Sequence, residues 1–186
     1  LSTIVILSTC YIANKFFAFI FKTVTNLESV YISSLILILI VAPFRTVPEL
    51  VFIILVSIIA MASKYILAIN KKHIFNPAAI AVFITSIFSL GYASWWIGNQ
   101  WTLSAVLIGG LLIIRKIQRF NMIISFLTTF LLAILAFSFF NKSDLLQTIY
   151  GITLDSPILF FSFVMLVEPL TTPTTKNLQI IYGVVL

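Results

Sequence analysis

The chain alternates between long apolar blocks and short polar connections. The blocks cover approximately residues 1–21, 29–43, 48–69, 78–94, 101–114, 120–140, 157–168 and 178–186. Several approach the length of about 20 residues that an α-helix needs to cross a bilayer. Apolar residues follow one another without the alternation of a membrane β-strand, as in the run 35–41. We therefore predict an all-α fold, a polytopic transmembrane bundle of about seven to eight helices in a single transmembrane domain over residues 1–186.

Composition excludes a water-soluble domain. Hydrophobic residues make up 61% of the chain and charged residues 9%, with a mean hydropathy of +1.19. An average soluble domain is about half apolar and about a quarter charged. Both ends of the sequence lie in apolar runs, and the last block holds too few residues to span a bilayer. We expect a domain truncated at both ends, with helices or further domains beyond them.

The basic residues alternate along the connections between the blocks. Counting Lys64, the odd-numbered connections hold eight of the eleven Lys and Arg residues, and the even-numbered ones hold two. The positive-inside rule then places the odd connections, including the run Arg115–Arg119, in the cytoplasm beside anionic lipid headgroups. This predicts a multi-pass protein of the plasma or inner membrane whose positive charge faces membrane lipid and not nucleic acid.

Two connections carry further signals. Trp95, Trp96 and Trp101 cluster in an uncharged connection, which is typical of a membrane–water boundary, and stacking on a planar cofactor is the alternative. The most polar stretch, Asn141–Asp155, predicts a short interfacial helix at the outer surface.

Several kinds of chemistry are excluded by residue counts and missing motifs. Cys10 is the only cysteine and His73 the only histidine. Multi-thiolate zinc or iron–sulfur sites and a haem held by two histidines are therefore impossible within the chain. The sequence has no P-loop, dinucleotide fingerprint, GxSxG or HExxH motif. We assign no catalytic residue and no metal ligand.

The strongest local feature is the segment 71–79, Lys-Lys-His-Ile-Phe-Asn-Pro-Ala-Ala. Pro77 suits the first turn of a helix, and Asn76 before it can cap that helix. Alternatively, free N–H groups at the helix start, with two lysines nearby, suit an anionic or electron-rich ligand. The residues leave both interpretations open.

The second feature is the segment 168–176, in which Glu168 ends an apolar block and four threonines and two prolines follow. A polar loop at membrane depth is tolerated where it lines a cavity or is buried in protein. A carboxylate there is a functional candidate, and a solvated Glu168 at the headgroups is the alternative.

At the other end of the chain, Thr25 or Asn26 can cap a helix that has Glu28 in its first turn, and ion coupling by Glu28 is a further possibility.

The order of these motifs resembles one membrane-protein family. Leu27-Glu28-Ser29 precedes an apolar helix that ends in Ala42-Pro43, and Lys64 follows. Next come Phe75-Asn76-Pro77-Ala78, then Glu168-Pro169-Leu170-Thr171-Thr172-Pro173, and finally Ile181-Tyr182-Gly183. In this order the chain is similar to the membrane D subunit of Rnf electron-transport complexes and to the B subunit of the sodium-translocating NADH:quinone reductase, over roughly residues 25–186.

The resemblance implies a flavoprotein subunit of a membrane oxidoreductase that binds riboflavin or FMN. The residues it implicates in flavin binding are His73, Phe75, Asn76, Pro77, Glu168, Thr171 and Thr172. Glu28 and Glu168 are candidates for ion coupling. The resemblance also implies partners, either other subunits or a fused soluble FAD/NAD reductase domain.

The chain departs from the family pattern at two places. His73 stands where the family has the first asparagine of its Asn-x-x-Asn-Pro segment. The Ser-Gly-Ala-Thr motif that attaches FMN covalently is absent, so we expect non-covalent flavin. Two other functions stay open: a secondary transporter or ion-translocating protein without a redox cofactor, which would also use Pro-broken helices, and a structural anchor that only recruits partners.

Overall fold

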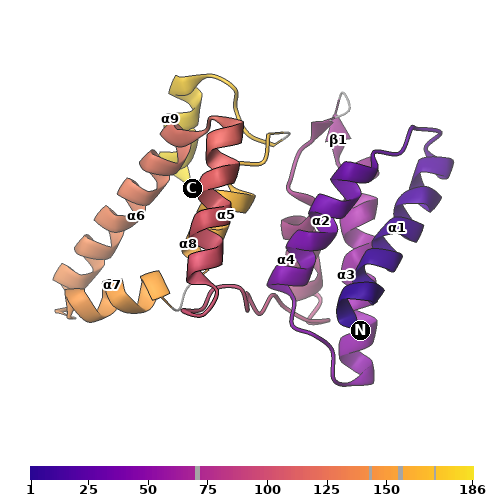
Figure 1. Ribbon diagram of the computed structural model, residues 1–186, viewed down its shortest axis with the longest axis horizontal. Coiled ribbons are helices and arrows are strands. Elements are labelled where there is room, and N and C mark those ends of the chain that lie inside the picture. Colours follow the sequence, from indigo (N-terminus) through magenta and orange to yellow (C-terminus); the bar gives the residue numbers. More distant parts are fainter. Residues whose placement is uncertain (70–71, 143, 155–156, 170) are drawn as a thin grey trace. The chain divides into compact units, whose positions relative to one another are not determined.

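The computed structural model describes residues 1–69, 72–142, 144–154, 157–169 and 171–186. These residues are mostly helical, as predicted, and they form two compact units (Figure 1). The N-terminal unit is Leu1–Trp96 and the C-terminal unit is Ile97–Leu186. Each unit is described separately below, and the single domain expected from the sequence stays a prediction.

The N-terminal unit contains four helices and a short β-ladder. Its elements are α1 (Ser2–Ile20), α2 (Leu27–Ile40), α3 (Val47–Ile66), β1 (Ala68–Ile69), β2 (Lys72–His73) and α4 (Pro77–Ile87). Helix α3 packs against α1 and α4, and α2 also contacts all three. Because α3 contacts every other helix of the unit, its buried residues, among them Ile53, Val56 and Met61, form the centre of the core.

Side-chain caps fix where three of these helices begin. Asn26 Oδ1 accepts the backbone N–H of Ser29 at 3.1 Å at the start of α2. The Glu49 carboxylate accepts the N–H groups of Arg45 and Thr46 before α3. Asn76 caps α4, with Pro77 at the first helical position. Each cap satisfies N–H groups that have no partner within the helix. Of the two caps considered for α2, Asn26 is the one observed, and the cap predicted at Asn76 is confirmed.

Helix α4 ends earlier than the apolar block that predicts it. The block extends to about residue 94, whereas the helix ends at Ile87 and is followed by positive φ angles at Ser89 and Gly91. The chain then turns back, and the N–H groups of Ser94 and Trp95 donate to the Ile40 carbonyl at the end of α2. The tryptophan-containing connection therefore satisfies carbonyl groups at the C-terminus of α2.

The C-terminal unit is also helical. Its elements are α5 (Leu103–Ile117), α6 (Phe120–Asn141), α7 (Leu145–Leu154), α8 (Ile158–Phe160), the π-helix η1 (Phe161–Met165) and α9 (Lys176–Val185). Helix α6 packs closely on α9, and α5 packs against α8 and η1. The buried core comprises Ile114, Met122, Ile123, Phe126, Phe163, Leu166 and Val167.

Helix α7 occupies the polar stretch Asn141–Asp155, where the sequence predicts a short helix. Asp144 caps it, because Asp144 Oδ1 accepts the N–H of Leu146 at 2.9 Å. Asp155 lies outside the described residues, and the interfacial position of α7 stays a prediction.

Among the described residues, three helices are long and apolar enough to cross a membrane, namely α1, α3 and α6. Each of the eight predicted blocks contains helix among the described residues. However, α2 has 14 residues and α4 has 11, which correspond to about 21 Å and about 16 Å against a hydrocarbon core of about 30 Å. The number of seven to eight spans therefore stays a prediction.

Candidate functional site

One end of the N-terminal unit gathers polar side chains from three elements. Lys64, in the last turn of α3, is only 7% exposed. Its Nζ atom donates to the Ser29 carbonyl oxygen at 2.6 Å and to Ser29 Oγ at 3.0 Å, at the start of α2. A cation in the last turn is favoured by the α3 dipole. We call Ser29, Lys64 and His73 the Lys64 cluster.

The short β-ladder positions His73 in this cluster. His73 pairs with Ala68 in an antiparallel register, immediately after α3. Its imidazole is hydrogen-bonded to the Lys64 backbone, and its Nδ1 atom is buried without a partner among the described residues. Burial lowers the pKa of His73, and the nearby Lys64 cation lowers it further. Both effects favour the neutral form of the imidazole. Lys71, two residues before His73 in the sequence, lies outside the described residues.

The segment after His73 leads directly into α4. Phe75 is 51% exposed and Pro77 is buried. Asn76 Oδ1 accepts the N–H groups of Ala78 and Ala79 at 3.0 and 3.1 Å. These are the free N–H groups that we had considered as ligand donors. Because Asn76 itself occupies them, any ligand here would rely on side chains and on the cation of Lys64.

A second polar contact joins α1 to α3 in the same unit. The Tyr65 hydroxyl donates to Asn14 Oδ1 at 2.8 Å, while Asn14 Nδ2 is buried without a partner among the described residues. The Tyr65 ring stacks on Phe21, with centroids 5.7 Å apart. Sequence reasoning missed Asn14, although an amide inside an apolar block is the signal that could have identified it.

Glu28 is the remaining candidate in this unit. It lies in the first turn of α2, as predicted, and its residue is exposed. It is adjacent in sequence to Ser29 of the Lys64 cluster. The N-terminal unit therefore contains five of the site residues predicted from the sequence, namely Glu28, His73, Phe75, Asn76 and Pro77.

Glu168, Thr171 and Thr172 belong to the C-terminal unit. The Glu168 backbone carbonyl accepts the Thr172 hydroxyl at 2.7 Å and the Thr171 N–H at 3.3 Å. The Thr172 hydroxyl therefore closes the turn after the π-helix η1. Leu170, within this turn, lies outside the described residues. A site shared between these residues and the Asn76 segment stays a prediction.

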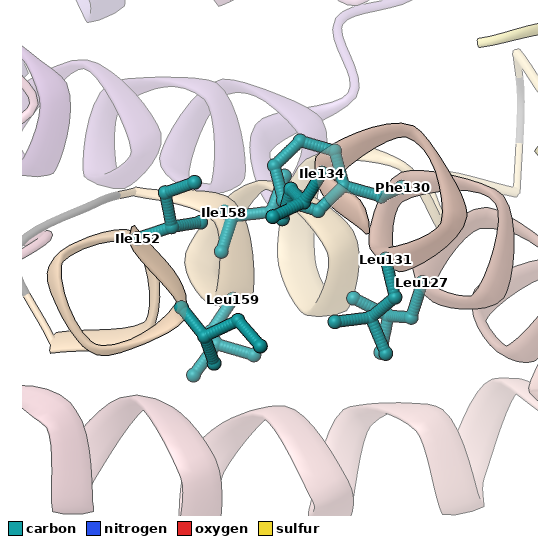
Figure 2. Close-up of a pocket in the computed structure, with 8 residues that line it drawn as sticks. Leu127, Phe130, Leu131, Ile134, Ile152, Ile158 and Leu159 are labelled. Carbon is teal, nitrogen blue, oxygen red and sulfur yellow. The ribbon is translucent and has the colours of Figure 1, made fainter. Parts of the chain in front are cut away.

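The C-terminal unit also contains an apolar cavity of about 200 Å³. Figure 2 shows its side chains, which come from α6, α7 and α8. They are Leu127, Phe130, Leu131, Ile134, Ile149, Ile152, Ile158 and Leu159. Ligand pockets usually measure about 300–1,000 Å³ and include a few polar groups. This cavity is smaller and its lining residues are all apolar, so it does not match the chemistry of a flavin site.

Metal binding finds no support in the part of the chain that the structure describes, where no group of three or more His, Cys, Asp or Glu residues could hold an ion. No protein-family model matches the chain, and neither a curated protein nor a solved structure matches it. The likeness to the Rnf D and sodium-pump B subunits therefore rests on the motifs alone and stays a prediction.

Proposed function

We propose that this chain is the membrane part of an electron-transport complex and that its N-terminal unit positions a non-covalent flavin, riboflavin or FMN. The observation that supports the proposal best is the contact of the buried Lys64 with His73, three residues before Asn76. The motif that suggested flavin from the sequence thus adjoins a buried cation.

The chemistry of this end of the unit suits an isoalloxazine ring. The ring becomes more electron-rich when it is reduced, and a positive charge in a poorly solvated position stabilises that form. Lys64 would supply the charge and the exposed ring of Phe75 would supply a packing surface. His73 Nδ1 is a buried polar atom without a partner among the described residues. Flavin would supply the electron chemistry, and the chain would supply position and electrostatics.

The remaining parts of the proposal come from the sequence. We place the protein in the plasma or inner membrane with its basic connections in the cytoplasm, together with other subunits or a fused FAD/NAD reductase domain. Glu168, Thr171 and Thr172 are retained as candidate flavin contacts, and Glu28 and Glu168 as candidates for ion coupling.

The deciding experiment is an absorption spectrum of detergent-purified protein supplied with riboflavin or FMN, followed by acid precipitation. We expect flavin bands that move to the acid supernatant, because the attachment is non-covalent. Flavin retained in the pellet would contradict that part of the proposal. Protein that binds no flavin would contradict the proposal as a whole.

Two variants test the assignment of residues. Lys64→Met removes the buried cation, and Lys15→Met removes an exposed cation of α1 as a matched control. We expect flavin to be lost in the first variant and retained in the second. Asn76→Ser keeps a helix-capping oxygen but removes the amide. Lower flavin content with unchanged thermal stability would then assign Asn76 to the flavin and not only to the cap.

Ion translocation without a redox cofactor is the second candidate, favoured by polar side chains inside apolar helices. Cys10 and Asn14 of α1, Ser34 of α2 and Ser57 of α3 are buried in the same unit as Lys64. Ionisable residues within membrane segments, of which Lys64 is one, commonly mark ion pathways. Ion uptake by proteoliposomes that contain no electron donor or acceptor would favour this function over the first.

A further inference from the structure

Arg119 differs from the other basic residues of its connection. Arg115 and Lys116 are exposed in the last turn of α5, whereas Arg119, at the N-cap of α6, is only 7% exposed. Its Nη1 atom is fully enclosed and has no hydrogen-bond partner among the described residues. Within the described residues, its guanidinium makes no hydrogen bond, ion pair or ring contact.

Burying the Arg119 guanidinium in this way costs free energy unless a negatively charged group binds to it. Arginine stays charged at every physiological pH. A buried charge without a counter-charge loses its hydration and gains nothing in return. Topology alone explains the exposed Arg115 and Lys116, since a topology determinant needs only to stay in water. It does not explain why the third cation is buried.

The surroundings of Arg119 add positive potential. Helices α6 and α9 start at the same end of the C-terminal unit, where α5 finishes (Figure 1). Neither helix has a side-chain cap: Arg119 precedes α6 and Thr175 precedes α9 without capping hydrogen bonds. The N–H groups of both first turns therefore point outward together, and Lys176 begins α9.

Close packing fixes this pair of helix starts. A Cβ atom at Gly183 would overlap Ser125 Oγ and the Met122 carbonyl oxygen of α6. Gln179 lies one turn earlier on the same face of α9, which brings it to the level of Arg119. Gln179 is 4% exposed, and its amide donates to the carbonyl groups of Pro173 and Thr174, which holds the preceding loop in place.

Neither described carboxylate of this unit, Asp144 or Glu168, forms an ion pair with Arg119, and Asp155 lies outside the described residues. Asp144 caps α7 at the opposite end of α6. The Glu168 carboxylate acts electrostatically on Tyr182, three residues beyond Gln179 on α9. We propose that Arg119 and the adjoining N-termini of α6 and α9 form a binding site for a phosphate group. A guanidinium and helix N–H groups are the donors that phosphate prefers.

The phosphate can belong to an anionic lipid headgroup or to a soluble ligand, and reconstitution distinguishes them. Purified protein is placed in micelles of an uncharged maltoside detergent, which contains no phosphate, either alone, with added phosphatidylglycerol, or with inorganic phosphate in the buffer. Unfolding temperature is read from tryptophan fluorescence. We compare wild type with Arg119→Met, and use Arg115→Met as the matched loss of an exposed cation.

We expect phosphatidylglycerol to raise the unfolding temperature of wild type and Arg115→Met, and to leave Arg119→Met unchanged. In the phosphate-free micelles Arg119→Met should be at least as stable as wild type, because it removes an unmatched buried charge. Lipid binding by native mass spectrometry should weaken about tenfold or more in Arg119→Met. Stabilisation by inorganic phosphate alone would identify a soluble phosphate compound as the ligand.

Two results would overturn the proposal. The first is equal stabilisation of wild type and Arg119→Met by phosphatidylglycerol, or no stabilisation of wild type by either phosphate source. The second is a clear loss of stability of Arg119→Met in the phosphate-free micelles, which would reveal a partner for the guanidinium within the chain.

Discussion

The two units join their helices by different means. In the N-terminal unit, hydrogen bonds connect elements that are far apart in sequence. Lys64 of α3 donates to Ser29 of α2, Tyr65 of α3 donates to Asn14 of α1, and Trp96 Nε1 donates to the Ile38 carbonyl of α2 at 2.8 Å. Polar side chains thus connect helices that are otherwise rich in apolar residues.

In the C-terminal unit, glycines allow helices to pack closely against one another. Gly183 of α9 lies against α6, and a Cβ atom at Gly110 of α5 would overlap the ring of Phe163 in η1. Apolar helices in lipid gain little from the hydrophobic effect between them, so small residues and polar bonds are the two general ways to hold them together. This chain uses both small residues and polar bonds.

The largest expected effect comes from Gly183→Ala. The added methyl group meets a backbone oxygen of α6 that cannot rotate away, so α6 and α9 must separate. We expect a loss of about 2 kcal/mol or more in the free energy of unfolding. Gly109→Ala is the control, because a Cβ there has nothing within 4 Å and a helical alanine should add up to about 1 kcal/mol. Denaturation in detergent measures both, and equal stability of the two variants would contradict glycine packing.

Much of the fold followed from the sequence because apolar runs determine where helices form. The parts that did not follow depend on contacts between distant residues. Helix α4 stops at Ile87 because the next connection turns back to donate to the Ile40 carbonyl, and no local pattern encodes that bond. The two-residue ladder that places His73 beside α3 is a tertiary feature of the same kind.

The sequence also predicted only part of the candidate site, namely the contacts between neighbouring residues. The Asn76 cap was readable because it joins neighbouring residues. The contact of Lys64 with Ser29 spans 35 residues and was not readable. Arg115 and Arg119 look equivalent in sequence, and only burial separates them. Composition and spacing therefore locate polar segments, whereas packing decides which of their side chains are enclosed.

An intermediate effect is expected at the Tyr65–Asn14 contact. Tyr65→Phe leaves Asn14 Oδ1 without its donor inside the apolar interior, which should cost about 1–2 kcal/mol of unfolding free energy. In the double variant with Asn14→Leu, both polar groups are gone, so we expect the effects to be less than additive by about 1 kcal/mol. Exactly additive effects in a double-mutant cycle would mean that this bond does not help to hold α1 and α3 together.

The smallest effect, and the most specific to the N-terminal unit, is the pH dependence of His73. Burial and the Lys64 cation lower its pKa below the ordinary value of 6.5. As the pH falls below that value, the unfolded chain takes up a proton that the folded chain resists, so stability should decline. His73 is the only histidine, so its side chain is the main group expected to titrate between about pH 7.5 and 5.5. His73→Gln should therefore flatten the plot of unfolding temperature against pH in this range. A slope that persists in the variant would mean that His73 stays solvated. That result would contradict the enclosure of His73 in the Lys64 cluster.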